Sequence, residues 1–205
     1  MAELESCDVM MKVIKFLSSL LQRVSETNDG FRFFHTQRIS IFHGLTRPTI
    51  SIESYLERIF KYANCSPSCF VVAYIYLDRF AQKQPLLPIN SFNVHRLLIA
   101  SVLVSAKFMD DIFYNNAYYA KIGGITTAEM NLLEMDFLFG LGFQLNVSIS
   151  TFHHYCSYLQ REMLLEFPPL IISPNIGITD DHKLLFCVNE EGSTTSTTHQ
   201  QQLAV

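Results

Sequence analysis

Hydrophobic residues near the start of the chain recur at the spacing of an amphipathic helix. They lie between residues 6 and 26 and comprise Val9, Val13, Phe16, Leu17, Leu20, Leu21 and Val24. The polar run Asn28-Asp29-Gly30 follows and is typical of a helix end. We therefore expect an N-terminal helix over about residues 6–26. A connector over residues 31–48 has no clean period, and its aromatic residues predict that it packs on the domain: Phe31, Phe33, Phe34 and Phe42.

Five more helical patterns follow in quick succession. Ser51 is placed to cap the first, and Pro67 occupies the tolerated first turn of the second. Thr126, with Glu129 three residues later, predicts a capping box for the fifth. The expected ranges are 52–63, 67–82, 92–110, 116–122, and from 126 to the glycines at 140 and 142.

A last amphipathic stretch spans residues 152–167 and ends at Pro168-Pro169. Beyond it, residues 192–202 are rich in Ser, Thr, His and Gln, which cannot bury enough apolar surface to fold. No strand pattern of any length is visible, so the predicted fold class is all-α. We expect an N-terminal helix and connector over 1–47, a five-helix domain over 48–147, a C-terminal helix over 148–169, and a largely disordered tail over 170–205.

The third helix of the five-helix domain is apolar on nearly every side, the pattern of a helix enclosed by others. Its longest apolar stretch, from Leu97 to Ala106, is shorter than the roughly 20 residues that a bilayer requires. The first residues include Glu3, Glu5 and Asp8 and lack the basic segment of a secretory signal. We expect no membrane association and a location in the nucleus and/or cytoplasm.

Composition narrows the classes of partner. Hydrophobic residues make up 49% of the 205 residues and charged residues 17%, so a substantial core can form. A net charge of -4 argues against a nucleic-acid-binding surface, which a basic stripe would mark. The five cysteines are odd in number and irregularly spaced, which fits a reducing compartment better than a disulfide framework.

No pattern for catalysis or metal binding stands out. Cys65 and Cys69 lie far along the chain from the run His153-His154-Tyr155-Cys156, and neither group has zinc spacing. His95 falls on a predicted helix, as do the histidines of that run, and none neighbours a glycine-framed nucleophile turn. We therefore expect no enzyme, no metal, no cofactor and no small-molecule substrate.

Four charged residues inside apolar helices are more informative. Arg58 lies on the first helix of the five, Asp78 on the second, Lys107 on the third and Glu134 on the fifth. Burying an isolated charge is costly, so each must find a partner or face an edge of the core. For any one of them, a place on the surface of an imperfectly amphipathic helix is the simpler interpretation.

Segments at successive helices resemble the signatures of the cyclin family. They are Leu77-Asp78-Arg79-Phe80, Ser105-Ala106-Lys107-Phe108, and Asn131-Leu132-Leu133-Glu134 leading to Gly142-Phe143-Gln144-Leu145. The resemblance covers about residues 48–146. In detail the chain is similar to the plant P-type (U-type) cyclins, relatives of the fungal cyclin of the phosphate-starvation pathway. It implies a single cyclin box, the five-helix cyclin fold, with an extra N-terminal helix and a short C-terminal helix.

The resemblance also implies a function and its residues. A cyclin binds and activates a cyclin-dependent kinase, here one of A-type-like character, by holding the αC helix of the kinase. Lys107 and Glu134 match the pair that bonds the backbone flanking αC. The residues that match the apolar groove for αC are Phe108, Leu138, Phe143 and Leu145. Arg58 and Asp78 match a buried structural ion pair.

Some residues depart from the cell-cycle cyclins. Glu57 precedes Arg58, and Lys61 interrupts the apolar stretch, where many cyclins carry a substrate-docking patch. A role in cell division and one in nutrient (phosphate) signalling both stay open. A cyclin-fold adaptor for a non-kinase protein or nucleic acid is the main alternative, although the acidic charge and the single box disfavour it. A small helical enzyme is a third hypothesis.

Overall fold

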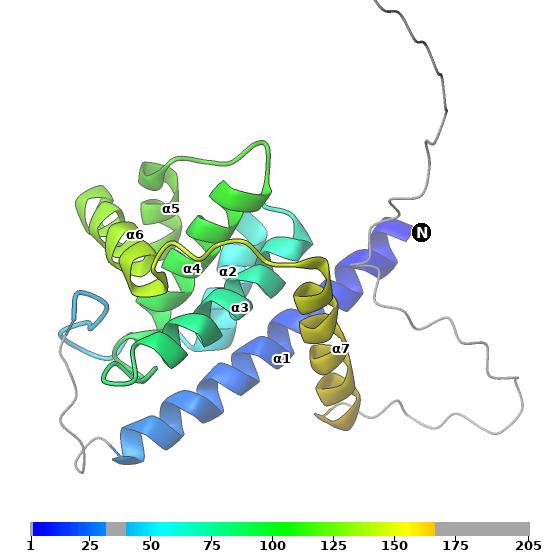
Figure 1. Cartoon of the computed structure of the whole chain (residues 1–205), viewed down its shortest axis with the longest axis horizontal. Coiled ribbons are helices and arrows are strands. Elements are labelled where there is room, and N and C mark those ends of the chain that lie inside the picture. Colours follow the sequence, from blue (N-terminus) through cyan, green and yellow to red (C-terminus); the bar gives the residue numbers. More distant parts are fainter. Residues whose placement is uncertain (1, 32–39, 167–205) are drawn as a thin grey trace, which may run out of the picture.

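The computed structural model describes residues 2–31 and 40–166, and helices account for most of them. They are α1 (Ala2–Phe31), α2 (Ile52–Tyr62), α3 (Pro67–Lys83), α4 (Val94–Met109), α5 (Asn116–Gly123), α6 (Thr127–Leu141) and α7 (Ile149–Glu166) (Figure 1). The described ranges contain no strand, so the all-α prediction is confirmed. None of the helices in these ranges is long and apolar enough to cross a membrane.

Helix α4 lies at the centre of the bundle, in contact with α2, α3, α5 and α6. From Val94 to Ala106 every residue except Arg96 is buried, as its apolar pattern predicts. Ser101 and Ser105 are buried too, and their hydroxyls donate to backbone carbonyls three residues earlier at 2.8 and 2.9 Å. Both polar groups are therefore satisfied within the helix itself, and α4 can be enclosed without an energetic penalty from unpaired hydroxyls.

The long helix α1 runs along one side of the bundle and packs against α2 and α7 (Figure 1). It continues through Asn28, Asp29 and Gly30, so the prediction of an end near residue 26 is wrong. The polar residues do not break the helix, because their side chains bond to other parts of the chain. Asn28 donates to the carbonyl of Ile89 at 2.7 Å. The sequence signal of a helix end is here a tertiary contact.

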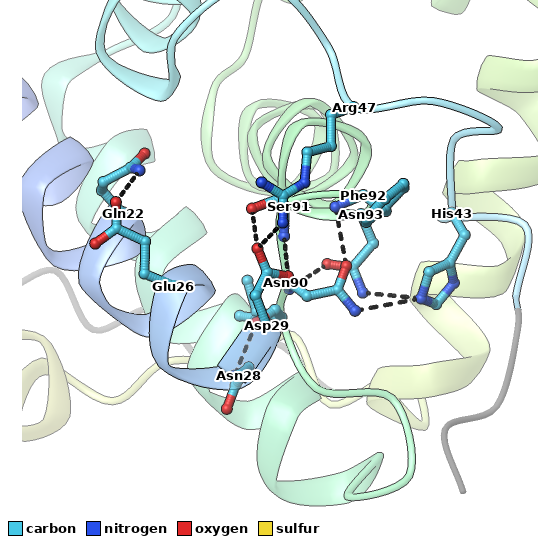
Figure 2. Close-up of polar contacts among 11 residues, drawn as sticks. Gln22, Glu26, Asn28, Asp29, His43, Arg47, Asn90, Ser91, Phe92 and Asn93 are labelled. Atoms are coloured by element: carbon cyan, nitrogen blue, oxygen red, sulfur yellow. Dashed lines mark hydrogen bonds and ion pairs between the residues drawn. The ribbon is translucent and has the colours of Figure 1, made fainter. Parts of the chain in front are cut away.

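A polar cluster fixes the C-terminal end of α1 to the α3–α4 loop and to the connector (Figure 2). The carboxylate of Asp29 accepts from the guanidinium of Arg47 at 2.6 Å and from both the hydroxyl and the backbone N–H of Ser91. Beside it, Asn90 N–H donates to the side-chain oxygen of Asn93 at 2.8 Å. This loop turn delays the start of α4 to Val94, two residues later than the predicted start at residue 92.

Three aromatic rings join the connector to the bundle. Phe42 makes edge contacts with Phe80 of α3 and Phe137 of α6, at centroid distances of 5.4 and 6.4 Å. Phe80 and Phe137 stack on each other at 5.1 Å. The prediction that the connector packs on the domain is confirmed at Phe42, which is buried. Phe33 and Phe34 lie outside the described residues, and the same holds for the tail over 170–205.

The close approach of α3 and α6 requires a glycine at position 140. A Cβ atom there would lie 2.2 Å from a ring carbon of Phe80, whose ring Phe42 and Phe137 hold in place. We expect Gly140→Ala to lower the free energy of unfolding by about 1–3 kcal/mol through overpacking. Urea denaturation followed by circular dichroism measures this. Gly30→Ala on α1 is the control, because nothing lies within 4 Å of its added methyl. Equal stability of the two variants would contradict the prediction.

Candidate protein-interaction site

Lys107 and Glu134 lie side by side at one surface of the bundle. Lys107 is in the last turn of α4 and Glu134 is in the middle of α6, and the distance from Nζ to Oε1 is 2.7 Å. The side chains are 28% and 16% exposed, so both still reach solvent. The structure thus brings together the two charges that the sequence singled out on separate helices.

A third side chain fixes Glu134. Asn116 at the start of α5 donates through Nδ2 to Glu134 Oε2 at 2.6 Å and to Asn131 Oδ1 at 2.8 Å. Both carboxylate oxygens are therefore engaged, one by Lys107 and the other by Asn116. The sequence placed Asn116 only as a helix start. Nothing in its local pattern indicated a contact with a residue on α6.

Exposed apolar side chains lie on the same two helices as the pair and on the segment after α6. Phe108 is 49% exposed and Phe143 is 55% exposed, while Leu138 and Leu145 are partly buried against the core. The outer face of α6 adds Leu132, Met135 and Phe139, all exposed. Since the opposite face of α6 is buried in the core, this surface helix is apolar on both sides. Contiguous exposed apolar residues mark interaction surfaces.

The backbone after α6 takes an unusual path. Gly142 and Phe143 both have left-handed backbone angles, with φ of +60° and +57°. The first is natural for glycine, but for a bulky residue such as Phe143 this conformation costs about 1–3 kcal/mol and needs support from its surroundings. The turn leaves the Phe143 ring in edge contact with Phe139, at a centroid distance of 5.2 Å. The segment therefore holds an aromatic ring outward at a measurable conformational cost.

The predicted ion pair between Arg58 and Asp78 is wrong. No salt bridge joins these two described residues. The carboxylate of Asp78 instead accepts from Tyr155 of α7 at 2.5 Å and from Gln82 at 2.9 Å. The guanidinium of Arg58 lies over the ring of Tyr55, 5.0 Å from its centroid. Arg58 faces the end of α5 and Asp78 faces α7, so the two charges point toward different neighbours.

The residues considered for catalysis or metal binding have structural surroundings. Cys69 is buried, and both its thiol and the backbone N–H of Ser66 donate to the carboxylate of Asp110, at 3.3 and 2.9 Å. The neighbouring Cys69 thiol, together with burial, raises the pKa of the Cys65 thiol and disfavours a reactive thiolate. Within residues 2–31 and 40–166 no three metal-ligating side chains converge. Asp110 thus anchors the start of α3 to the end of α4.

Comparison with known proteins agrees with this fold. A family model described as Cyclin matches residues 17–145, more than half of the chain. The chain belongs to the cyclin family. It is 64% identical to Cyclin-U4-1 of Arabidopsis thaliana over 208 residues, which is 100% of both proteins. It is 56% identical to Cyclin-P4-1 of Oryza sativa subsp. japonica over 178 residues, 84% of each. Within the family it therefore belongs with the plant U- and P-type cyclins.

Family membership has two consequences for function. Cyclins are regulatory proteins and not catalysts, so the chain is placed among regulators. The family also implies a cyclin-dependent kinase as the partner. The family match begins inside α1, upstream of the predicted start of the box at residue 48.

His95 gives the core a measurable pH dependence. Its Nε2–H donates to the carbonyl of Ile50 at 3.0 Å, while Nδ1 is buried without a partner. Burial, with a smaller contribution from the nearby Arg58 charge, lowers the pKa of His95 below its usual 6.5, although the bond to Ile50 opposes the shift. The unfolded chain therefore binds a proton more readily than the folded chain. We expect stability to be fully present above pH 6.5 and to fall as the pH decreases toward 5.5.

Urea unfolding between pH 7.5 and 5.5 tests this expectation. His95→Gln is the matched variant, because its amide can still donate to Ile50 but does not titrate. The stability of the variant should depend less on pH than that of the unchanged chain. The same slope in both proteins would contradict the assignment to His95.

Proposed function

We propose that this chain binds and activates a plant A-type cyclin-dependent kinase by holding the kinase αC helix in its active position. The observation that carries the proposal is the Lys107–Glu134 pair, 2.7 Å apart, with exposed Phe108 next to Lys107 in the chain and exposed Phe143 just after α6. Charged groups fixed beside apolar side chains suit a protein interface, in which buried polar groups orient the partner and apolar groups contribute most of the affinity.

The pair is built to receive backbone groups of a partner. Lys107 has three N–H donors, and one of them is used by Glu134. The remaining donors can bond backbone carbonyls. Each carboxylate oxygen of Glu134 can accept more than one bond, so Glu134 can also receive backbone N–H groups. Docking removes water from both side chains and strengthens these bonds, because the effective dielectric falls.

The proposed activation follows from differential affinity. A protein kinase needs its catalytic lysine paired with a glutamate on αC, and the position of αC controls that pairing. A domain that binds the αC-in state more tightly than the αC-out state shifts the kinase toward the active state. The enclosed helix α4 and the capped helix α6 carry the pair, so the site is rigid enough to discriminate between the two states.

The biological setting is part of the proposal. The resemblance to P-type cyclins supports regulation of cell division or of nutrient (phosphate) signalling, and a location in the nucleus and/or cytoplasm. These two roles differ in the substrates of the complex and not in the αC contact. Identifying the kinase that co-purifies with the full chain from plant cells is the first step toward separating them.

Replacing both charges should abolish kinase binding. We expect the variant Lys107→Ala with Glu134→Ala to lose co-purification with an A-type cyclin-dependent kinase while its helical content stays unchanged. Ion pairs that remain in contact with water contribute only about 0–1 kcal/mol to folding. Truncating one partner of a charged contact buried in an interface costs about 2–5 kcal/mol of binding free energy. Pull-down with purified kinase measures the loss of binding, and circular dichroism measures the helical content.

Arg96→Ala is a matched control. Arg96 and Glu129 form another ion pair between α4 and α6 with the same 2.7 Å separation, and its carboxylate is the more exposed of the two, at 37% against 16% for Glu134. Arg96 is in the first turn of α4, at the other end of the helix from Lys107, and Glu129 is in the first turn of α6, five residues before Glu134. The control should therefore bind the kinase as the unchanged chain does. Normal kinase binding by the Lys107–Glu134 variant would refute the proposed function.

A further inference from the structure

One face of α3 makes a series of polar contacts with the backbone that follows α6. Tyr76, Arg79 and Lys83 lie at helical spacing on this face. The Tyr76 hydroxyl donates to the carbonyl of Leu145 at 2.7 Å. Burial raises the pKa of Tyr76 to about 12, so its hydroxyl keeps the proton that it donates.

The two cations continue the series. Arg79 Nη1 donates to the carbonyls of Gln144 at 2.9 Å and Asn146 at 3.0 Å. Lys83 Nζ donates to the carbonyl of Leu141 at 2.6 Å and to the side-chain oxygen of Gln144 at 2.7 Å. We call Tyr76, Arg79 and Lys83 the carbonyl clamp. The resemblance to cyclins implies no kinase-binding role for these three residues, and it includes Arg79 only as part of the Leu77-Asp78-Arg79-Phe80 signature.

Side-chain packing alone does not hold this segment. An open pocket of about 440 Å³ lies between it and α3, lined by Arg79, Gln82, Lys83 and residues 143–146. The clamp bonds span this region. Lys83 also satisfies the carbonyl of Leu141, the last residue of α6, where positive charge is favourable because of the helix dipole. Hydrogen bonds from α3 therefore determine the path of the chain from Leu141 to Asn146.

The clamped segment includes the strained residue. Phe143 has a φ of +57°, and its own backbone bonds are local: its N–H donates to Leu138 at 3.0 Å. A left-handed conformation at a bulky residue persists only when the surrounding structure fixes it. The clamp bonds the residues on both sides of Phe143, namely Leu141, Gln144 and Leu145. It is thus placed to maintain the conformation that points the Phe143 ring outward.

We propose that Tyr76, Arg79 and Lys83 are positioning residues for kinase binding, which act by fixing Phe143 and Leu145 at the edge of the αC groove. This inference rests on the proposed function. None of the residues predicted to contact the kinase lies on α3. The inference nevertheless gives α3 control over one wall of the groove. A clamp that only stabilised the fold would affect unfolding but would leave affinity unchanged in the folded chain.

A double-mutant cycle tests the positioning role. The clamp variant is Arg79→Met with Lys83→Met, and the probe is a purified plant A-type cyclin-dependent kinase titrated against the full chain. We expect the clamp variant to bind roughly tenfold more weakly than the unchanged chain. In a Phe143→Ala background the same two changes should weaken binding less than about twofold, because the groups that they position include the missing ring. Lys61→Met, an exposed lysine in the last turn of α2, is the control and should bind normally.

Hydrogen exchange provides a local readout. Backbone amides of residues 143–145 should exchange faster in the clamp variant, while those in the middle of α4 stay protected. Rescue by Arg79→Lys with Lys83→Arg, which keeps both positive charges and donors, should recover part of the affinity. If the double Met variant does not fold, Tyr76→Phe removes a single hydroxyl and Lys83→Met a single cation, and each should weaken binding in the same direction.

The outcomes separate this inference from the function on which it rests. Unchanged affinity in folded clamp variants, combined with loss of binding in the Lys107–Glu134 variant, overturns the positioning role alone. Equal losses in the Phe143 and Phe143→Ala backgrounds overturn it as well. Kinase binding that survives the Lys107–Glu134 changes overturns the proposed function itself.

Discussion

Enclosure of α4 is the constraint on which the rest of the molecule depends. Four helices cover α4, and its residues are buried from the first turn almost to the last. Apart from Arg96, only the final turn reaches solvent, where Lys107 is partly exposed and Phe108 and Met109 are exposed. A lysine at the end of a mostly apolar, enclosed helix reaches solvent only where the covering helices end. The site therefore lies at the edge of the core, where α6 passes beside the end of α4 and supplies Glu134.

The energetics of the Lys107–Glu134 pair argue for recognition and not for stability. Both side chains retain contact with water, and such pairs add little to folding. Asn116 nevertheless donates to the second carboxylate oxygen of Glu134 and restricts the rotation of this side chain. Stability alone does not require Glu134 to be fixed in this way. Phe143 is a similar case. Its left-handed backbone conformation opposes folding, and its half-exposed ring returns little stability. We expect such fixed surface side chains where a protein must bind its partner in one geometry, because preorganisation lowers the entropic cost of binding.

Local signals in the sequence predict the helices well and the tertiary contacts unevenly. Ser51, Pro67 and the Thr126–Glu129 capping box mark helix starts because each acts on neighbouring backbone groups. Lys107 and Glu134 could be paired through the family resemblance, since both lie within its most specific motifs. Asp78 could not be assigned correctly, because its partner Tyr155 lies on α7, outside the segment that the resemblance covers. The C-terminal end of α1 was missed for a similar reason: Asn28 and Asp29 have partners about 60 residues further along the chain.

The misassigned Asp78 also shows how helices outside the five-helix box can act on the site. Asp78 directly precedes Arg79 on α3, and Tyr155 of α7 bonds its carboxylate on the side away from Arg58. Helix α7 packs against both α1 and α3, so it braces α3 while the opposite face of α3 holds the segment after α6. The position of the Phe143 ring thus depends on a chain of contacts from α7 through α3 to residues 141–146. In this way α7 braces the helix that holds the segment after α6.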